Sequence, residues 1–207
     1  MFKRKEKVPT VRINRSDDGI ENYFLKIALL GDGAVGKTNL RRRYLGQVFT
    51  TDHLMTLGAD FAAAEKNIEM NDKTFHITFQ VWDLAGQENF NQVRSMYYRG
   101  CFGALMVFDR TRPASFRNIP NWIAELKKNS GKDLIPIILL GNKFDLVDTA
   151  KNIVPKEDID KFLSDINEEA LKKGFEVKYL DTSALTGLNV EVAFETLGKS
   201  ILTWLKV

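Results

Sequence analysis

A run of eight residues, 31–38, constrains the fold of this 207-residue chain more than any other stretch. It reads Gly-Asp-Gly-Ala-Val-Gly-Lys-Thr, which matches the phosphate-loop pattern. The apolar run 23–30 before it is short and rich in β-formers, and Leu40 and Tyr44 after it have helical spacing. The run therefore predicts a glycine-rich turn between a buried strand and a helix, a place where phosphate groups bind.

The residue types in this loop suit a polyphosphate. Glycines allow the backbone N–H groups to turn inward, and the start of a helix adds a partial positive charge. Lys37 would neutralise phosphate, and the hydroxyl of Thr38 would ligate Mg²⁺. An ordinary glycine-rich turn is the alternative. We expect a bound nucleotide to contact Gly31, Asp32, Gly33, Ala34, Val35, Gly36, Lys37, Thr38 and Asn39.

Hydrophobic periodicity divides the rest of the chain into strands and helices. Apolar residues alternate with other residues over 75–81, which indicates a strand with one buried face, and residues 71–73 predict a turn from a preceding strand. Further apolar runs cover 104–108, 135–140 and 175–180, and helical patterns cover 113–128, 156–172 and 190 to the end. This order predicts an α/β fold: an about six-stranded, mostly parallel sheet with one antiparallel edge hairpin and helices on both faces.

The amino-terminal residues differ from the rest. Residues 1–21 contain six Lys or Arg and have no sustained period. We expect residues 1–21 to form a basic, flexible arm. Residues 22–207 have the length of one domain.

Composition and charge exclude several classes of protein. The 44% hydrophobic content is typical of globular chains, and a net charge of +3 is too small to indicate nucleic-acid binding. A single cysteine, Cys101, permits no internal disulfide and indicates a cytoplasmic protein. No apolar run approaches the roughly 18 residues of a membrane span, and no residue at either end suits a lipid anchor. We expect a monomer whose membrane contact is at most weak or partner-mediated.

A second motif predicts which base the nucleotide carries. Asn142-Lys143-Phe144-Asp145 directly follows the apolar run that ends near residue 140. The carboxylate of Asp145 can accept two hydrogen bonds at once, and guanine offers such a donor pair in its N1–H and amino group. Thr182-Ser183-Ala184 follows the next predicted strand, and a parallel sheet brings both loops to one edge. The two motifs together indicate guanine.

Four separated motifs, in this order, resemble those of the Ras-type small GTPases. Besides the two above, Trp82-Asp83-Leu84-Ala85-Gly86-Gln87-Glu88 looks like the second metal and switch motif, and Thr56-Leu57-Gly58 like the first switch. The similarity covers about residues 23–205. Within the family the Rab branch is most similar, on the basis of Phe61, Met96-Tyr97-Tyr98-Arg99-Gly100 and Asn121-Trp122.

The resemblance implies roles for individual residues. Thr38 and Thr56 would hold Mg²⁺ directly and Asp83 through a water, while Gln87 would orient the attacking water. Gly33 matches a position where a side chain would obstruct the transition state. The implied catalytic residues are Gln87, Lys37, Thr56 and Gly86, with the N–H of Gly86 donated to the γ-phosphate. The implied nucleotide contacts beyond the phosphate loop are Phe49 (over guanine), Thr56, Asp83, Gly86, Asn142, Lys143, Asp145, Ser183, Ala184 and Leu185.

These features predict a Mg²⁺-dependent switch that binds GTP or GDP, slowly hydrolyses GTP, and regulates trafficking or signalling. Residues 47–58 (the first switch segment) and 86–96 (the second) would be ordered by the γ-phosphate and would contact effector proteins. An exchange factor and a GTPase-activating protein would act on it, the latter supplying an arginine unless Arg94 does so. A non-hydrolysing nucleotide-dependent scaffold is the alternative, and the presence of both Gly33 and Gln87 argues against it.

Several residues depart from the family pattern or leave two interpretations open. Leu185 stands where the family has a lysine, Leu84 replaces the threonine usual among Rab proteins, and a prenylated tail is absent from the sequence. The aromatic residues Phe61, Trp82 and Tyr97 would contact effectors or would simply pack. Arg41, Arg42 and Arg43 predict a solvated helix face with one packed stem.

Overall fold

The computed structural model describes residues 12–15, 21–50, 56, 58–87 and 91–207, and the side chains of all of these except 12–15, 21 and 91–93. Its strands are β1 (Arg12–Arg15), β2 (Glu21–Leu30), β3 (Ala59–Met70), β4 (Lys73–Leu84), β5 (Gly103–Asp109), β6 (Ile137–Asn142) and β7 (Lys178–Asp181). Its helices are α1 (Lys37–Tyr44), α2 (Asn91–Tyr98), α3 (Pro113–Arg117), α4 (Ile119–Asn129), α5 (Lys156–Ala170) and α6 (Val190–Leu205), with short 3-10 turns η2 (Phe144–Leu146) and η3 (Leu171–Lys173).

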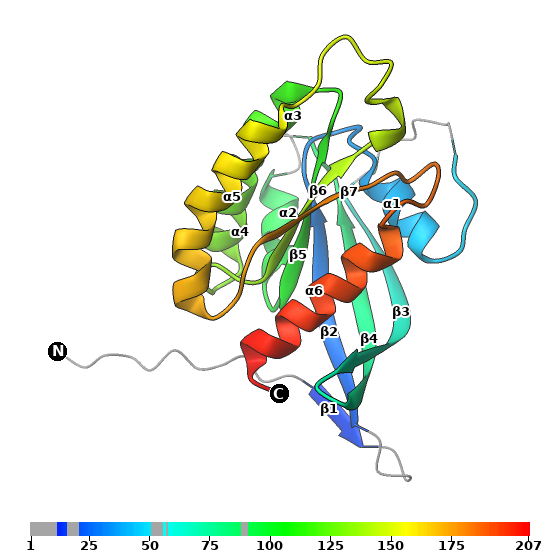
Figure 1. Cartoon of the computed structure of the whole chain (residues 1–207). Coiled ribbons are helices and arrows are strands. Elements are labelled where there is room, and N and C mark those ends of the chain that lie inside the picture. Colours follow the sequence, from blue (N-terminus) through cyan, green and yellow to red (C-terminus); the bar gives the residue numbers. More distant parts are fainter. Residues whose placement is uncertain (1–11, 16–20, 51–55, 57, 88–90) are drawn as a thin grey trace, which may run out of the picture.

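The strands of the described residues form one sheet in the order β3-β4-β2-β5-β6-β7, with β1 added beside β2 (Figure 1). Strands β4, β2, β5, β6 and β7 run parallel, and β3 pairs antiparallel with β4 at the edge. Asn71 and Asp72 make the hairpin turn with φ angles of 53° and 58°. Asn and Asp tolerate this left-handed region better than other side chains. The predicted α/β fold with one antiparallel edge hairpin is confirmed.

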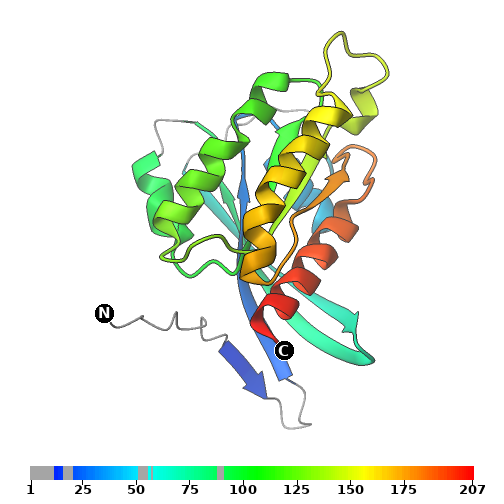
Figure 2. The same ribbon diagram turned by 60° about the vertical axis from the view of Figure 1, so that its left-hand side comes forward.

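Strand β1 lies within the interval that the sequence predicts to be an arm. It pairs antiparallel with residues 21–24 of β2. On β2, β5 pairs only with residues 27–30, so the first half of β2 keeps an open edge that β1 can fill. The β1–β2 pair and the tip of the β3–β4 hairpin project from the same end of the sheet (Figure 2). The division into an arm and a domain at residue 21 stays a prediction, since residues 1–11 and 16–20 lie outside the described part.

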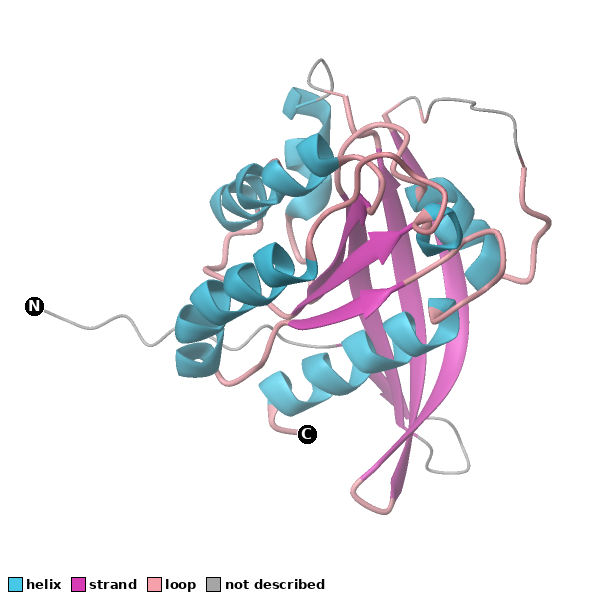
Figure 3. Ribbon diagram, turned by 45° about the horizontal axis from the view of Figure 1, so that its top comes forward, coloured by secondary structure: helices cyan, strands magenta, loops and turns pink. Residues whose placement is uncertain are grey.

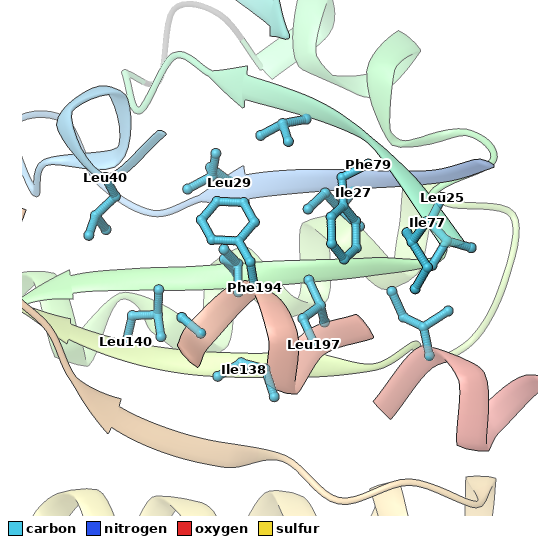
Figure 4. Close-up of a cluster of buried hydrophobic side chains, with 14 of the residues drawn as sticks. Leu25, Ile27, Leu29, Leu40, Ile77, Phe79, Ile138, Leu140, Phe194 and Leu197 are labelled. Atoms are coloured by element: carbon cyan, nitrogen blue, oxygen red, sulfur yellow. The ribbon is translucent and has the colours of Figure 1, made fainter. Parts of the chain in front are cut away.

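Alternate residues of the central strands face opposite sides of the sheet, each covered by helices (Figure 3). On one side, Leu25, Ile27 and Leu29 of β2 pack with α1 and α6. Figure 4 shows Leu40 of α1 and Phe194 of α6 in this cluster. On the other side, Ala28 and Leu30 pack with residues of α2, α4 and α5. The sheet is therefore buried on both faces, as expected for parallel strands.

Two predicted elements are shorter than their patterns suggested. The helical pattern 113–128 is divided into α3 and α4, because Pro120 cannot occupy a helix interior but fits the first turn of α4. The apolar run 175–180 becomes a strand only from residue 178. The backbone N–H and carbonyl of Val177 are instead hydrogen-bonded to the side chain of Asn167 on α5. No helix was predicted over 91–98, where the structure has α2.

Cys101, two residues before β5, is fully buried, and its burial raises the pKa of the thiol to about 11. This agrees with the interpretation of Cys101 as a small core residue rather than a reactive thiol. Leu84 is also fully buried, on the side of the sheet covered by α2 and α4, so its departure from the family pattern affects packing. Within the described residues, no helix combines the length and the apolar character that crossing a bilayer requires.

Candidate functional site

The carboxyl ends of the parallel strands point to the top of Figure 1, where their loops enclose a cleft of about 830 Å³. Of the predicted site residues, those lining the cleft are Gly33, Ala34, Gly36, Lys37, Thr38, Asn39, Phe49, Thr56, Gly86, Gln87, Asn142, Lys143, Asp145, Ala184 and Leu185. The others are Gly31, Asp32, Val35, Asp83 and Ser183, and each is hydrogen-bonded to a residue of the lining. The fold thus brings the whole predicted set together.

The phosphate loop, residues 31–38, has a backbone shape that depends on glycine. Gly31 and Gly36 have φ angles of +137° and +99°, which L side chains rarely adopt. A Cβ on Gly31 would lie 2.0 Å from the carbonyl oxygen of Val107, and one on Gly36 would lie 2.3 Å from Nδ2 of Asn142. The loop can therefore pack against β5 and β6 only with glycine at both positions.

Lys37 begins α1 and its ammonium group is buried under the loop. Its Nζ donates to the carbonyls of Gly31 at 2.6 Å and Asp32 at 2.8 Å. Burial lowers the pKa of Lys37 to about 8, against the opposing effect of the carboxylates of Asp83 and Asp32. A bound anion would favour the charged form of this lysine.

Side chains from outside the phosphate loop also hydrogen-bond to it. Oδ1 of Asp32 accepts hydrogen bonds from Nδ2 of Asn118 at 2.6 Å and from Nε1 of Trp122 at 2.8 Å. Nη2 of Arg112 donates to the carbonyl of Gly33 at 2.7 Å. Helix α4 and the loop after β5 therefore keep the phosphate loop in position.

Three oxygen-bearing side chains meet at the floor of the cleft. Oγ1 of Thr38 donates to Oδ2 of Asp83 at 2.5 Å and lies 2.9 Å from Oγ1 of Thr56. Asp83 is fully buried, and its other oxygen, Oδ1, has no hydrogen-bond partner within the described part of the chain. Burial raises the pKa of Asp83, against the opposing effects of the Thr38 hydroxyl and Lys37. An unsatisfied, desolvated carboxylate beside two hydroxyls is an oxygen donor set that suits Mg²⁺.

Gly86, the first residue of the second switch segment, lies against the phosphate loop. A Cβ on Gly86 would lie 2.3 Å from the carbonyl carbon of Asp32 and 2.4 Å from the backbone N of Gly33. A Cβ on Gly33, in contrast, would meet only Cγ of Gln87 among the described residues, at 3.9 Å. The described residues leave room for a side chain at position 33, so a requirement for glycine there would come from a ligand between the loop and Gln87.

The GTP hydrolysis that the sequence predicts should be slowed roughly 100-fold by Gly86→Ala in a single-turnover assay, because the added methyl displaces backbone rather than a flexible side chain. GDP dissociation, measured on the same preparation, should change much less. Gly131→Ala is the control: a Cβ at Gly131 meets no atom of the described residues within 4 Å, so the strain that a side chain meets at its φ of +73° should lower stability and leave the hydrolysis rate unchanged. Equal hydrolysis rates for Gly86→Ala and wild type would contradict the close approach.

Asn142 joins the phosphate loop to the loop after β7. Its Nδ2 donates to the carbonyl of Val35 at 2.8 Å, and its Oδ1 accepts from the backbone N–H of Ala184 at 3.2 Å. Beside it, Oγ of Ser183 donates to Oδ1 of Asp145, and Leu185 is 52% exposed at the rim of the cleft. The two motifs predicted to read the base are therefore adjacent, as the sequence predicted.

Lys143 points from the same strand end toward β5. Its Nζ lies 2.7 Å from Oδ2 of Asp109. Although burial acts to raise the pKa of Asp109, the hydrogen bonds from Lys143 and Thr111 hold it below the usual value. Lys143 also lines the cleft.

The sequence analysis missed three residues of the cleft: Arg42, Thr50 and Leu146. Nη1 of Arg42 donates to Oγ1 of Thr50 at 2.6 Å, and Nδ2 of Asn39 donates to the carbonyl of Thr50 at 3.1 Å. The signal for Arg42 was its position four residues after Thr38, which places both on one face of α1.

Of the three arginines of α1, for which the sequence predicts a solvated face with one packed stem, Arg41 is the packed one. Arg41 is buried and ion-paired with Asp60 of β3, and its Nε has no partner among the described residues. Arg43 donates to the carbonyl of Thr186 at 2.8 Å, in the loop after β7. Together the three arginines connect α1 to three segments around the cleft. The sequence could not predict these contacts, because periodicity does not show which neighbours a helix face will meet.

A phosphate loop between β2 and α1, at the carboxyl edge of a mostly parallel sheet, defines a P-loop nucleotide-binding protein. The sequence model described as "Ras family" matches residues 26–203. Curated relatives include "Ras-related protein RABA4b" of Arabidopsis thaliana, 41% identical over 86% of this chain and 73% of the relative. They also include "Ras-related protein Rab-11C" of Dictyostelium discoideum, 40% identical over 84% and 71%, and "Ras-related protein Rab-8B" of Homo sapiens, 39% identical over 88% and 80%.

The chain therefore belongs to the Ras family, and it is a Rab-like small GTPase. It binds guanine nucleotides, hydrolyses GTP and acts as a molecular switch, as the sequence predicted. The scaffold without hydrolysis is not favoured. Ras-family GTPases in general are regulated by effectors, exchange factors and GTPase-activating proteins.

Proposed function

We propose that this chain is a Mg²⁺-dependent GTP/GDP switch in which Thr38, Thr56 and Asp83 form the metal site. The observation that carries the proposal is the buried, unpartnered Oδ1 of Asp83 beside the two threonine hydroxyls. Thr38 and Thr56 would be direct ligands, and Asp83 would act through a water. Bound there, Mg²⁺ would neutralise charge that develops on the phosphates during transfer.

Four groups of the chain would act on the phosphates. Lys37 lies under the loop and would contribute positive charge, while the backbone N–H of Gly86 would donate to the γ-phosphate. Thr56 would close over the metal, and Gln87 would orient the attacking water from its position against Gly33. Phosphoryl transfer needs positioning and charge stabilisation more than acid–base chemistry, so a neutral amide can suffice at Gln87.

The base would be read by the two loops beside Asn142. Asp145 would accept from N1–H and the amino group of guanine, supported by Ser183, and Phe49 would pack over the ring. Leu185 provides an apolar surface at the position where the family has a lysine. Loss of that contact would weaken nucleotide affinity without changing the preference for guanine.

The two switch segments would carry the signal to partners. Residues 51–55, 57 and 88–90 of these segments lie outside the described part of the chain. Next to them, Phe61, Trp82 and Tyr97 form a chain of rings with centroids 5.0 and 4.9 Å apart. Phe61 is 47% exposed, which supports effector contact through this aromatic surface. We propose that the protein regulates trafficking or signalling through it, as a cytoplasmic monomer whose membrane contact is weak or supplied by a partner.

The nucleotide that copurifies with the protein tests this function. Denatured protein should release GDP or GTP at close to one molecule per chain. Chelation of Mg²⁺ should then accelerate GDP release from the native protein, because the metal site holds the phosphate end of the ligand. Copurification of an adenine nucleotide, or a GDP release rate that a chelator leaves unchanged, would contradict the proposal.

A further inference from the structure

Arg94 of α2 is almost completely buried and lies beside the predicted catalytic segment. Its exposure is 2%. Nη1 of Arg94 donates to the carbonyl of Ala85 at 2.9 Å and to the carbonyl of Gln87 at 2.5 Å. One guanidinium nitrogen therefore holds the backbone on both sides of Gly86.

The other side of the guanidinium group is bound by α4. Nε and Nη2 of Arg94 each donate to one carboxylate oxygen of Glu125, both at 2.9 Å. Oε1 of Glu125 also accepts from the hydroxyl of Tyr98 at 2.8 Å, and the ring of Trp122 lies 4.5 Å from the guanidinium carbon. A bidentate pair of this kind has a defined geometry as well as charge. The orientation of Arg94 is therefore determined by α4.

This arrangement excludes Arg94 as the arginine that stabilises the transition state within the chain. Arg94 does not line the cleft, and its nitrogens are directed to Glu125 and to two backbone carbonyls. Moving it into the cleft would leave Glu125 in a largely buried place without its cation, which is costly.

We propose that Arg94 is a positioning residue for GTP hydrolysis, held by Glu125, which sets the backbone that presents the N–H of Gly86 and the side chain of Gln87. The proposal rests on the proposed roles of Gly86 and Gln87. Two carbonyls held by one rigid group leave the peptide units between them little freedom to rotate. Because a misplacement of about 1 Å can cost roughly 100-fold in rate, this restraint matters for catalysis.

Arg94→Lys tests the restraint, since lysine keeps the charge but cannot make the bidentate pair and both carbonyl contacts. We expect single-turnover hydrolysis of preloaded GTP to fall roughly 10- to 100-fold. GDP dissociation should stay close to wild type, while the thermal midpoint should fall, because the buried bidentate pair with Glu125 is lost. Glu125→Gln is the second variant, because Glu125 does not line the cleft and the change weakens its hold on Arg94. Its rate should fall in the same direction, even if Arg94→Lys does not fold. Tyr98→Phe is the control for Glu125→Gln, since Glu125 also accepts from the hydroxyl of Tyr98.

Arg117→Lys, at an exposed position of α3, is the matched control and should leave the rate unchanged. The decisive measurement combines each variant with Gln87→Leu. If Arg94 acts by positioning the catalytic segment, Arg94→Lys should cost much less in the Gln87→Leu background than in wild type. A merely structural effect of Arg94→Lys would lower the hydrolysis rate by the same factor in the wild-type and Gln87→Leu backgrounds.

The outcomes separate the inference from the function on which it rests. If Gln87→Leu hydrolyses GTP at the wild-type rate, the proposed role of Gln87 fails. If Gln87→Leu is slow while folded Arg94→Lys and Glu125→Gln match wild type, the positioning role of Arg94 is overturned. Equal losses in both backgrounds also overturn it.

Discussion

GDP bound to this protein will be displaced by GTP at concentrations roughly 10⁴-fold lower than by ATP. The reason is the carboxylate of Asp145, which lines the cleft beside Ser183 and can accept two hydrogen bonds from guanine. Adenine presents no such donor pair and would cover the carboxylate without satisfying it. A competition assay against a fluorescent GDP analogue measures the ratio directly.

Asp145→Asn should remove most of this preference. Its amide offers only one acceptor and places a donor against a donor of guanine. Two hydrogen bonds to a charged group are each worth about 1.5–3 kcal/mol, so GDP affinity should fall by about 10²- to 10⁴-fold. Asp148→Asn, in the same loop region but outside the cleft, is the control. In the wild-type protein, displacement of GDP by ATP as effective as displacement by GTP would refute the assignment of guanine as the base.

Gln87→Leu will keep GTP bound and lose the response to an activating partner. A partner that supplies an arginine should accelerate the wild type by roughly 10³- to 10⁵-fold, because Arg94 is committed to Glu125 and cannot act in its place. Leucine has nearly the shape of glutamine but cannot aim a water, so the accelerated rate should collapse in the variant.

Single-turnover hydrolysis, with and without such a partner, measures this effect. GDP and GTP dissociation rates should change little, since Gln87 would act on the water rather than on the nucleotide. Gln80→Leu, on β4 outside the cleft, controls for the loss of an amide elsewhere. Equal stimulation of Gln87→Leu and wild type would remove Gln87 from the mechanism.

The amino-acid sequence by itself determined the architecture and nearly all of the cleft. Hydrophobic periods of two and about 3.6 predict strands and helices because those periods are the geometry of the backbone. A parallel sheet brings the loops after its strands to one edge, so motifs as far apart as residues 31–38 and 182–184 could be placed together before any coordinates. Local backbone chemistry, such as glycine at positions 31 and 36, was equally readable.

Only the tertiary structure determined the contacts between segments whose separation in the sequence follows no regular pattern. Arg41, Arg42 and Arg43 look alike in the sequence, yet one is buried against Asp60 and the others hold Thr50 and the carbonyl of Thr186. The pattern left open whether Arg94 enters the active site, and its pairing with Glu125 shows that it does not. Long polar side chains can reach several neighbours, and which one they choose depends on packing that only the folded chain defines.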